Sequence, residues 1–144
     1  MGRGIELAAF VVDSSALISV LNNEEDAQPI KLALRTADEL HISVATVFEA
    51  SCVVRGPRFL DGTSRFNKLL ETLDMVHAAF DDEQLRVARA GYAMYGRGSG
   101  HRAGLNMGDC FAYALAKTLR LPLLFKGDDF LHTDIAVALH RKTT

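Results

Sequence analysis

Acidic side chains fall at four places in this 144-residue chain where their neighbours are mostly apolar. Asp13 ends the apolar run 8–12, Glu49 lies inside an apolar stretch, and Asp109 is embedded between apolar residues. Asp128 and Asp129 together follow Leu-Leu-Phe. A carboxylate beside apolar surface is costly unless a proton or a cation compensates it. The pattern therefore predicts one cluster that holds a divalent metal ion.

The type of ligand limits which metal ion and which reaction fit such a cluster. A site built from oxygen ligands alone favours Mg²⁺ or Mn²⁺ over zinc, which more often recruits His or Cys. One or two such ions stabilise an in-line displacement at a phosphodiester. Carboxylates suit this work because they neutralise the metal only in part and leave coordination positions for water and phosphate oxygen.

Composition sets the class of protein that must position these acids. The chain is 49% hydrophobic with a net charge of −2, which predicts one folded domain and excludes a strongly cationic surface. Its apolar runs are too short to span a membrane, and no signal-peptide pattern opens it. Cys52 and Cys110 lie far apart without a CxxC pair, so we expect a reducing, cytoplasmic setting. We expect a loose leader over residues 1–7 and the domain over 8–144.

Apolar runs alternate with helical patterns in the way that a parallel sheet requires. Run 8–12 predicts a strand buried on both faces, and Ser14 or Ser15 is expected to cap the helix that follows it. Further strands are expected at 40–42, 75–76 and 123–125, with an edge strand at 135–139. Further helices are expected from Pro29, after Ser43, over 66–73, over 81–95 and over 106–119. The prediction is a single α/β domain with a central, mostly parallel sheet flanked by helices.

This topology predicts that the separate acids meet. Ligands of open parallel sheets gather at the carboxyl ends of the strands. Asp13 and the pair Asp128 and Asp129 directly follow predicted strands, while Asp109 and Glu49 lie in the first and second turns of their helices. All four places converge if those helices start at that edge of the sheet.

Each acid also has a purely structural interpretation. Asp13 would cap a helix, Glu49 would face solvent, and Asp109 would favour a helix dipole. Whichever of Asp128 and Asp129 is not a ligand is expected to be a turn residue. Ser15 is expected either to hydrogen-bond an active-site carboxylate or to serve only as a cap.

The residues that carry these patterns resemble a known family, the PIN domains, and within it the VapC-type ribonuclease toxins. The resemblance rests on the Val-Val-Asp-Ser-Ser-Ala-Leu segment at 11–17, on Glu49, on the segment 105–116 and on the segment 123–130. It implies an endoribonuclease that depends on Mg²⁺ or Mn²⁺, is inhibited by a cognate VapB-type antitoxin and is usually dimeric. It also implies that Asp13, Glu49 and Asp109 are catalytic metal ligands.

The fourth acid of the family falls less clearly on this chain. Many relatives carry Thr-x-Asp after the last strand, and that aspartate position falls on Gly127 here. The subgroup that this chain resembles has Gly-Asn/Asp-Asp-Phe instead. We therefore expect Asp129 to be the fourth metal ligand, with Asp128 as the alternative.

Nearby polar residues complete the expected site. Asn106 is expected to cap its helix and to lie within reach of substrate. Arg97, His101 and Arg102, in a glycine-rich loop, either contact RNA phosphates or belong to a solvated loop. Leu85, Ala88, Tyr92 and Tyr95 share one helix face, and with the resemblance they predict a homodimer.

Two other functions compete with the nuclease. A catalytically weak PIN module would bind RNA or protein without cutting, although such a module tolerates loss of acids that are all present here. A haloacid-dehalogenase-like phosphatase would use Asp13 as nucleophile. Those enzymes usually carry a second Asp two residues later, where this chain has Ser15. The sequence does not select transfer, ribosomal or messenger RNA as substrate.

Overall fold

A parallel sheet of four strands runs through the centre of the computed structural model, which describes residues 7–139. The strand order is β3-β2-β1-β4, and every neighbouring pair is parallel. The strands are β1 (Ala9–Val12), β2 (Glu39–Ser43), β3 (Val76–Ala78) and β4 (Leu123–Leu124). The expected leader lies outside the described residues apart from Leu7.

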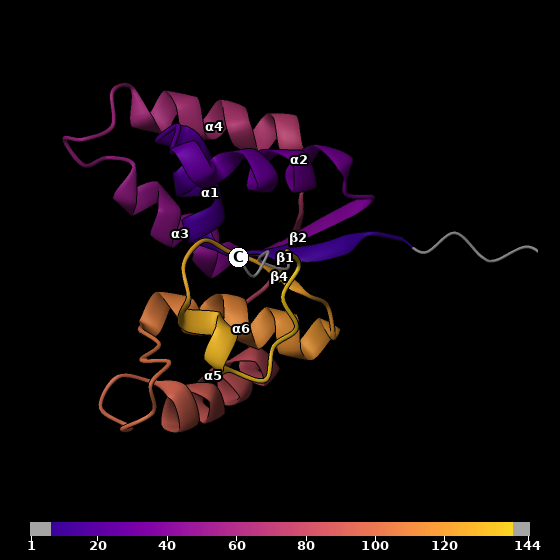
Figure 1. The fold of residues 1–144 in the computed structure, drawn as a ribbon, viewed down its shortest axis with the longest axis vertical. Helices are drawn as coiled ribbons and strands as arrows, with labels where there is room; N and C mark the ends of the chain where they lie inside the picture. Colours follow the sequence, from indigo (N-terminus) through magenta and orange to yellow (C-terminus); the bar gives the residue numbers. More distant parts are fainter. Residues whose placement is uncertain (1–6, 140–144) are drawn as a thin grey trace, which may run out of the picture.

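Helices cover both faces of the sheet (Figure 1). One layer contains α1 (Ser14–Leu21), α2 (Gln28–Thr36), α3 (Val44–Val53) and α4 (Gly62–Leu73), with the short 3-10 turn η1 (Glu25–Ala27). The other contains α5 (Asp82–Tyr95) and α6 (Met107–Leu119), and a second 3-10 turn, η2 (Asp129–His132), follows β4. The predicted α/β class with a central parallel sheet is confirmed.

Successive residues of the central strands serve different cores, because side chains alternate across a sheet. Val11 of β1 and Leu123 of β4 pack with residues of α5 and α6. Val12 and Leu124 pack with residues of α1 to α4. All four side chains are fully buried. This confirms that the continuous apolar run of β1 is buried on both faces, as the helix layers on either side require.

Two expectations about local structure are wrong. Asp13, not Ser14 or Ser15, is the N-cap of α1, since its side chain accepts the backbone N–H of Ser15. No edge strand forms at 135–139; that segment makes one isolated parallel bridge, between Leu123 and Val137. Two backbone hydrogen bonds make this bridge: Leu123 N donates to Ala136 O at 2.9 Å, and Ala138 N donates to Leu123 O at 3.0 Å.

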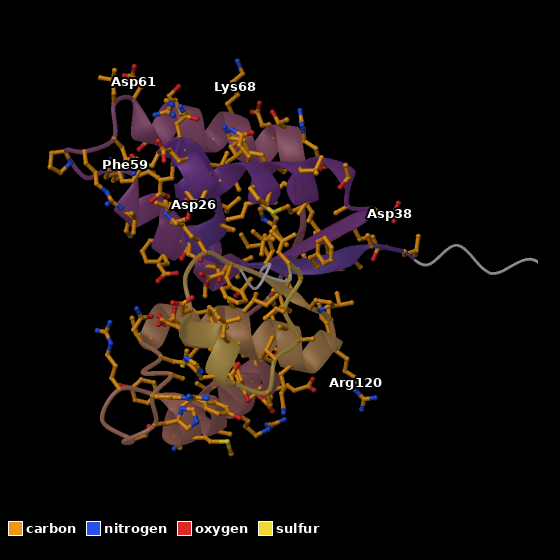
Figure 2. All side chains as sticks on the ribbon, in the orientation of Figure 1. Asp26, Asp38, Phe59, Asp61, Lys68 and Arg120 are labelled. Carbon is orange, nitrogen blue, oxygen red and sulfur yellow. The ribbon has the colours of Figure 1, made fainter. Side chains whose placement is uncertain are left out.

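The expected apolar face of α5 is divided between core and surface. Ala88 and Tyr95 are buried in the α5–α6 core, whereas Leu85 and Tyr92 are 45% and 43% exposed. On the opposite layer, Figure 2 shows Lys68 of α4 pointing away from the sheet. Among residues 7–139 no helix has the length and apolar character needed to cross a membrane.

The strand order places a switch point at β1. The chain passes from β1 to β2 on one side, and β4 returns to the other side of β1. The carboxyl ends of these parallel strands lie at one edge of the sheet, where crevices form between diverging connections. A backbone hydrogen bond of 3.0 Å from Asp13 N to Leu124 O ties the ends of β1 and β4 together there.

Candidate active site

Asp13 lies at this switch point, 2% exposed, immediately after β1. Its Oδ2 accepts hydrogen bonds from the Ser15 backbone N–H at 3.0 Å and from the Ser15 hydroxyl at 2.6 Å. Its Oδ1 is buried without a hydrogen-bond partner. One oxygen therefore caps α1, as the structural interpretation of Asp13 required, while the other remains available to a ligand.

Glu49 reaches the same place from α3, which packs against both α1 and α6. The Ser43 side chain accepts the Ala45 N–H and caps α3, as expected, and this fixes where the helix starts after β2. The Glu49 carboxylate lies against Gly108 at the start of α6, and its Oε1 is buried without a partner. Glu49 is thus not a solvent-facing residue on a helix side.

Asp109 occupies the first turn of α6 in a reciprocal cap. Its backbone N–H donates to Oδ1 of Asn106 at 2.8 Å, and its Oδ2 accepts the Asn106 N–H at 3.0 Å. The expected cap by Asn106 is confirmed. Because the carboxylate also takes part in the cap, its position at the mouth of the site is fixed by the helix itself.

The turn after β4 brings the fourth acid. Gly127 has φ of 101°, a conformation that side chains disfavour, and η2 then begins at Asp129 with Phe130 buried in the core. The charge of Asp129 raises the pKa of Asp109, so these two carboxylates are neighbours. Asp128 precedes η2 and is likewise exposed.

Lys126 anchors this turn. Its backbone N–H donates to the Ser15 hydroxyl at 3.0 Å, and its ammonium pairs with Glu24 at 2.5 Å and with Asp26 at 3.3 Å. Ser15 therefore hydrogen-bonds a candidate carboxylate, as the sequence suggested, and also contacts the turn that carries Asp129.

The electrostatics of the cluster resist full ionisation. Burial, together with the charges of Asp109 and Glu49, raises the pKa of Asp13 to about 7 against the opposing hydrogen bonds from Ser15. Burial also raises the pKa of Glu49 and that of Asp109, and the charge of a neighbouring carboxylate adds to each rise. Three carboxylates that repel one another in a desolvated place are stabilised by a bound cation.

The donor set fits a divalent cation that prefers oxygen. Within residues 7–139 no three His, Cys, Asp or Glu side chains already stand around a common point as metal ligands would. However, the cluster presents two buried carboxylate oxygens without partners, Asp13 Oδ1 and Glu49 Oε1. Such oxygens are costly without a compensating cation or proton.

The three basic residues of the glycine-rich loop, Arg97, His101 and Arg102, differ in how they relate to the carboxylate cluster. Arg97 is exposed, and its charge lowers the pKa of Asp109, so this cation lies close to the acids. His101 is engaged within the loop, because its Nδ1 accepts the Ala103 N–H at 3.0 Å and its ring packs edge-on against Tyr95. Arg102 is exposed on the same loop.

Two structural features of the site escaped the sequence analysis. One is the contact between Gly108 and Glu49; a glycine in the first turn of a predicted helix was its only signal. The other is the ion pairing of Lys126 with Glu24 and Asp26, which lie about a hundred positions away in the chain, as the separation of 102 residues between Lys126 and Glu24 shows. No local pattern reports such a pairing.

The chain is similar to known proteins over most of its length. The family model described as PIN domain matches residues 10–136. Ribonuclease VapC28 of Mycobacterium tuberculosis is 44% identical over 132 residues, which cover 92% of this chain and 99% of that protein. Ribonuclease VapC42 of the same species is 42% identical over 129 residues, covering 89% of this chain and 98% of the relative.

A solved structure agrees with the fold. A member of the VapBC family of toxin–antitoxin systems, VapBC-5 from Mycobacterium tuberculosis, superposes with a TM-score of 0.60 at 27% identity. The match covers 92% of this chain and 96% of that one. The likeness therefore extends over nearly the whole domain.

Proposed function

Because the chain belongs to the PIN domain family and, within it, to the VapC ribonucleases, we propose that it is an endoribonuclease toxin of a toxin–antitoxin system. Cleavage of RNA phosphodiester bonds would take place at the carboxylate cluster and would require Mg²⁺ or Mn²⁺. The relatives are ribonucleases, and a carboxylate cluster that can hold a divalent cation suits cleavage of a phosphodiester.

One observation carries the proposal: Asp13, fully desolvated at the end of β1, keeps one buried oxygen unpartnered beside Glu49 and Asp109. A structural aspartate needs only its capping oxygen. A second buried oxygen without a partner, near two more carboxylates, is unfavourable in the protein alone and favourable around a cation.

Each residue of the site has its own proposed role. Asp13, Glu49 and Asp109 would hold the cation, and Asp129 would supply further negative charge from the exposed side. A divalent ion bound there would stabilise negative charge at the phosphodiester and promote attack by water. Ser15 orients the Asp13 carboxylate by two hydrogen bonds. Arg97 and Arg102 lie on the adjoining loop, where a cation offsets repulsion between the acids and the RNA backbone.

The expected partners follow from the relatives. VapBC-5 is described as a toxin–antitoxin system, and we propose that a VapB-type antitoxin likewise binds and inhibits this chain. We also propose that the free protein is a homodimer. Transfer, ribosomal and messenger RNA are all compatible with the site, since nothing in a carboxylate cluster reads a base.

The two competing functions give different results in the same assay. A PIN module that only binds would retain RNA without producing new ends, and a phosphatase would release phosphate from a monoester. A phosphatase does not account for the likeness of the chain to ribonucleases. A module that only binds RNA does not need the mutually repelling carboxylates of Asp13, Glu49 and Asp109 to lie close together.

The experiment is to map RNA ends after brief expression of the chain, with Asp13→Ala as the control. Purified protein would then be incubated with RNA and, in parallel, with a phosphate monoester, each with Mn²⁺ or with EDTA. We expect discrete new RNA ends that need Asp13 and a divalent metal. Intact RNA with the wild-type chain would contradict a nuclease, and phosphate release alone would identify the phosphatase.

A further inference from the structure

Gly108 and Glu49 approach one another more closely than any side chain at position 108 would allow. Gly108 is the second residue of α6 and is buried. A Cβ built on Gly108 would lie 1.6 Å from Oε2, 2.4 Å from Cδ and 2.9 Å from Oε1 of Glu49. Non-bonded atoms do not come so close. The Glu49 carboxylate therefore occupies the volume that any other residue at position 108 would fill.

Helix formation does not explain a glycine here. Glycine is a poor helix former, and alanine would favour α6 by its intrinsic preference. The contact offers a reason for its presence. With no Cβ in the way, the Glu49 carboxylate lies against the start of α6, where the helix dipole favours negative charge. The next residue of α6, Asp109, adds its own carboxylate to the cluster.

The carboxylate cannot occupy this place and tolerate a methyl group as well. Glu49 extends from α3, so its carboxylate is the mobile end of a flexible side chain, whereas Gly108 belongs to a capped helix. A methyl group at position 108 would therefore displace the carboxylate and leave the helix where it is. The expected consequence is a change in the site at little cost to folding.

We propose that Gly108 is a positioning residue: its lack of a side chain places the Glu49 carboxylate beside Asp109 for metal binding. The inference rests on the proposed function for its importance to RNA cleavage, but not for the geometry it asserts. Gly108 itself would contact neither the reacting phosphate nor the attacking water.

The test is Gly108→Ala in the full chain, with three measurements: melting temperature, Mn²⁺ affinity from titration followed by electron paramagnetic resonance, and the rate of RNA cleavage. We expect an unchanged or higher melting temperature, Mn²⁺ affinity about tenfold weaker, and cleavage up to about a hundredfold slower, as misplacement of a catalytic group by an ångström produces. Met107→Ala is the matched control for Mn²⁺ affinity, because Met107 lies one residue earlier in α6 and is 73% exposed.

A double-mutant cycle shows whether the effect passes through Glu49. In a Glu49→Ala background the added methyl meets no carboxylate, so Gly108→Ala should weaken Mn²⁺ binding no further. Equal losses in both backgrounds would overturn the proposal, as would wild-type Mn²⁺ affinity in Gly108→Ala alone.

Failure of the proposed function would look different. If the wild-type chain does not cut RNA, the proposed nuclease function is wrong. The proposed role of Gly108 can still be tested by a crystal structure of Gly108→Ala. In that structure the Glu49 carboxylate should have moved away from the start of α6. A carboxylate that keeps its place, with α6 displaced instead, would overturn the inference whatever the activity.

Discussion

The Ser15 hydroxyl donates a 2.6 Å hydrogen bond to Oδ2 of Asp13, the oxygen that also caps α1. The same hydroxyl accepts the backbone N–H of Lys126 at 3.0 Å. One side chain thus connects the carboxylate after β1 to the turn after β4. The connection makes Ser15 a determinant of both the charge of Asp13 and the placement of Asp129.

Ser15→Ala should shift the pH dependence of cleavage. Burial and the neighbouring carboxylates raise the pKa of Asp13 to about 7 in the metal-free protein, even though the hydrogen bonds from Ser15 lower it. Without the hydroxyl the pKa rises further, so more Asp13 is protonated at neutral pH. We expect cleavage at pH 7 to fall roughly tenfold, equivalent to about 1.4 kcal/mol, and to recover in part at higher pH. Ser15→Thr keeps the hydroxyl and serves as control; a rate profile that does not move would contradict this role.

Asp13→Asn should change how stability depends on pH in metal-free protein. The pKa of Asp13 is raised from 3.8 to about 7, so between these values the folded state holds a proton that the unfolded state has lost. The contribution of Asp13 to the free energy of unfolding therefore falls as pH rises from about 4 to about 7.

Urea unfolding in EDTA at pH 5 and pH 8 measures this effect. Asn at position 13 keeps an oxygen for the cap and cannot ionise. The free energy of unfolding of the variant, relative to that of the wild-type chain, should therefore be higher at pH 8 than at pH 5. If the wild-type chain instead becomes more stable relative to the variant as the pH rises, the charged Asp13 carboxylate stabilises the fold and the expectation is wrong.

Asp109→Asn should separate activity from folding. An asparagine oxygen can still accept the Asn106 N–H in the reciprocal cap, while the repulsion among the acids is reduced. We expect the variant to melt no lower than the wild type without metal, yet to lose cleavage. Asp109→Ala also loses the cap and should be less stable by about 1 kcal/mol.

Activity and thermal melting with EDTA, then with added Mn²⁺, check the Asp109 variants. EDTA should abolish cleavage by the wild-type chain, and Mn²⁺ should restore it. Undiminished cleavage by a fully stripped sample would exclude the metal. A grossly unfolded Asp109→Asn would instead assign Asp109 a structural role alone.

Asp129→Ala should reduce cleavage more than Asp128→Ala. The Asp129 charge contributes to the raised pKa of Asp109, so Asp129 acts on a carboxylate of the cluster. The neighbouring Phe130 is 2% exposed, which fixes η2 in the core and with it the direction of Asp129. The loss should lie mainly in metal affinity and be partly recovered by raising Mn²⁺. Cleavage rates against Mn²⁺ concentration for both variants decide the matter, and a more damaged Asp128→Ala would reverse the assignment.

The free protein should be a dimer at tens of micromolar. Leu85 and Tyr92, which lie two helical turns apart on α5, are 45% and 43% exposed, and such an apolar helix face is the kind of surface that an interface covers. Light scattering coupled to size exclusion measures the mass directly. A monomer throughout that concentration range would contradict the expectation, and a heavier species with a small antitoxin would test the complex separately.

Local sequence determined most of the secondary structure. The helices capped by Ser43 and Asn106 start where expected, because a capping side chain and a following apolar face are encoded within a few residues. The sequence does not identify the cap of α1, because Asp13, Ser14 and Ser15 all have capping side chains and only the backbone angles select Asp13 among them. The edge strand expected at 135–139 forms only one bridge, because strand pairing depends on the tertiary context and is not encoded in a local apolar pattern.

The sequence alone determined which carboxylates are present and that a parallel sheet would bring them to one edge, since strand patterns and chain direction fix that topology. Only the tertiary structure decided how they are used. It gave Asp13 one capping oxygen and one unpartnered oxygen, put the Glu49 carboxylate against Gly108, and tied Lys126 to Glu24. Such contacts join residues distant in the chain, and their energies come from burial and close approach. Both quantities exist only once the helices have packed.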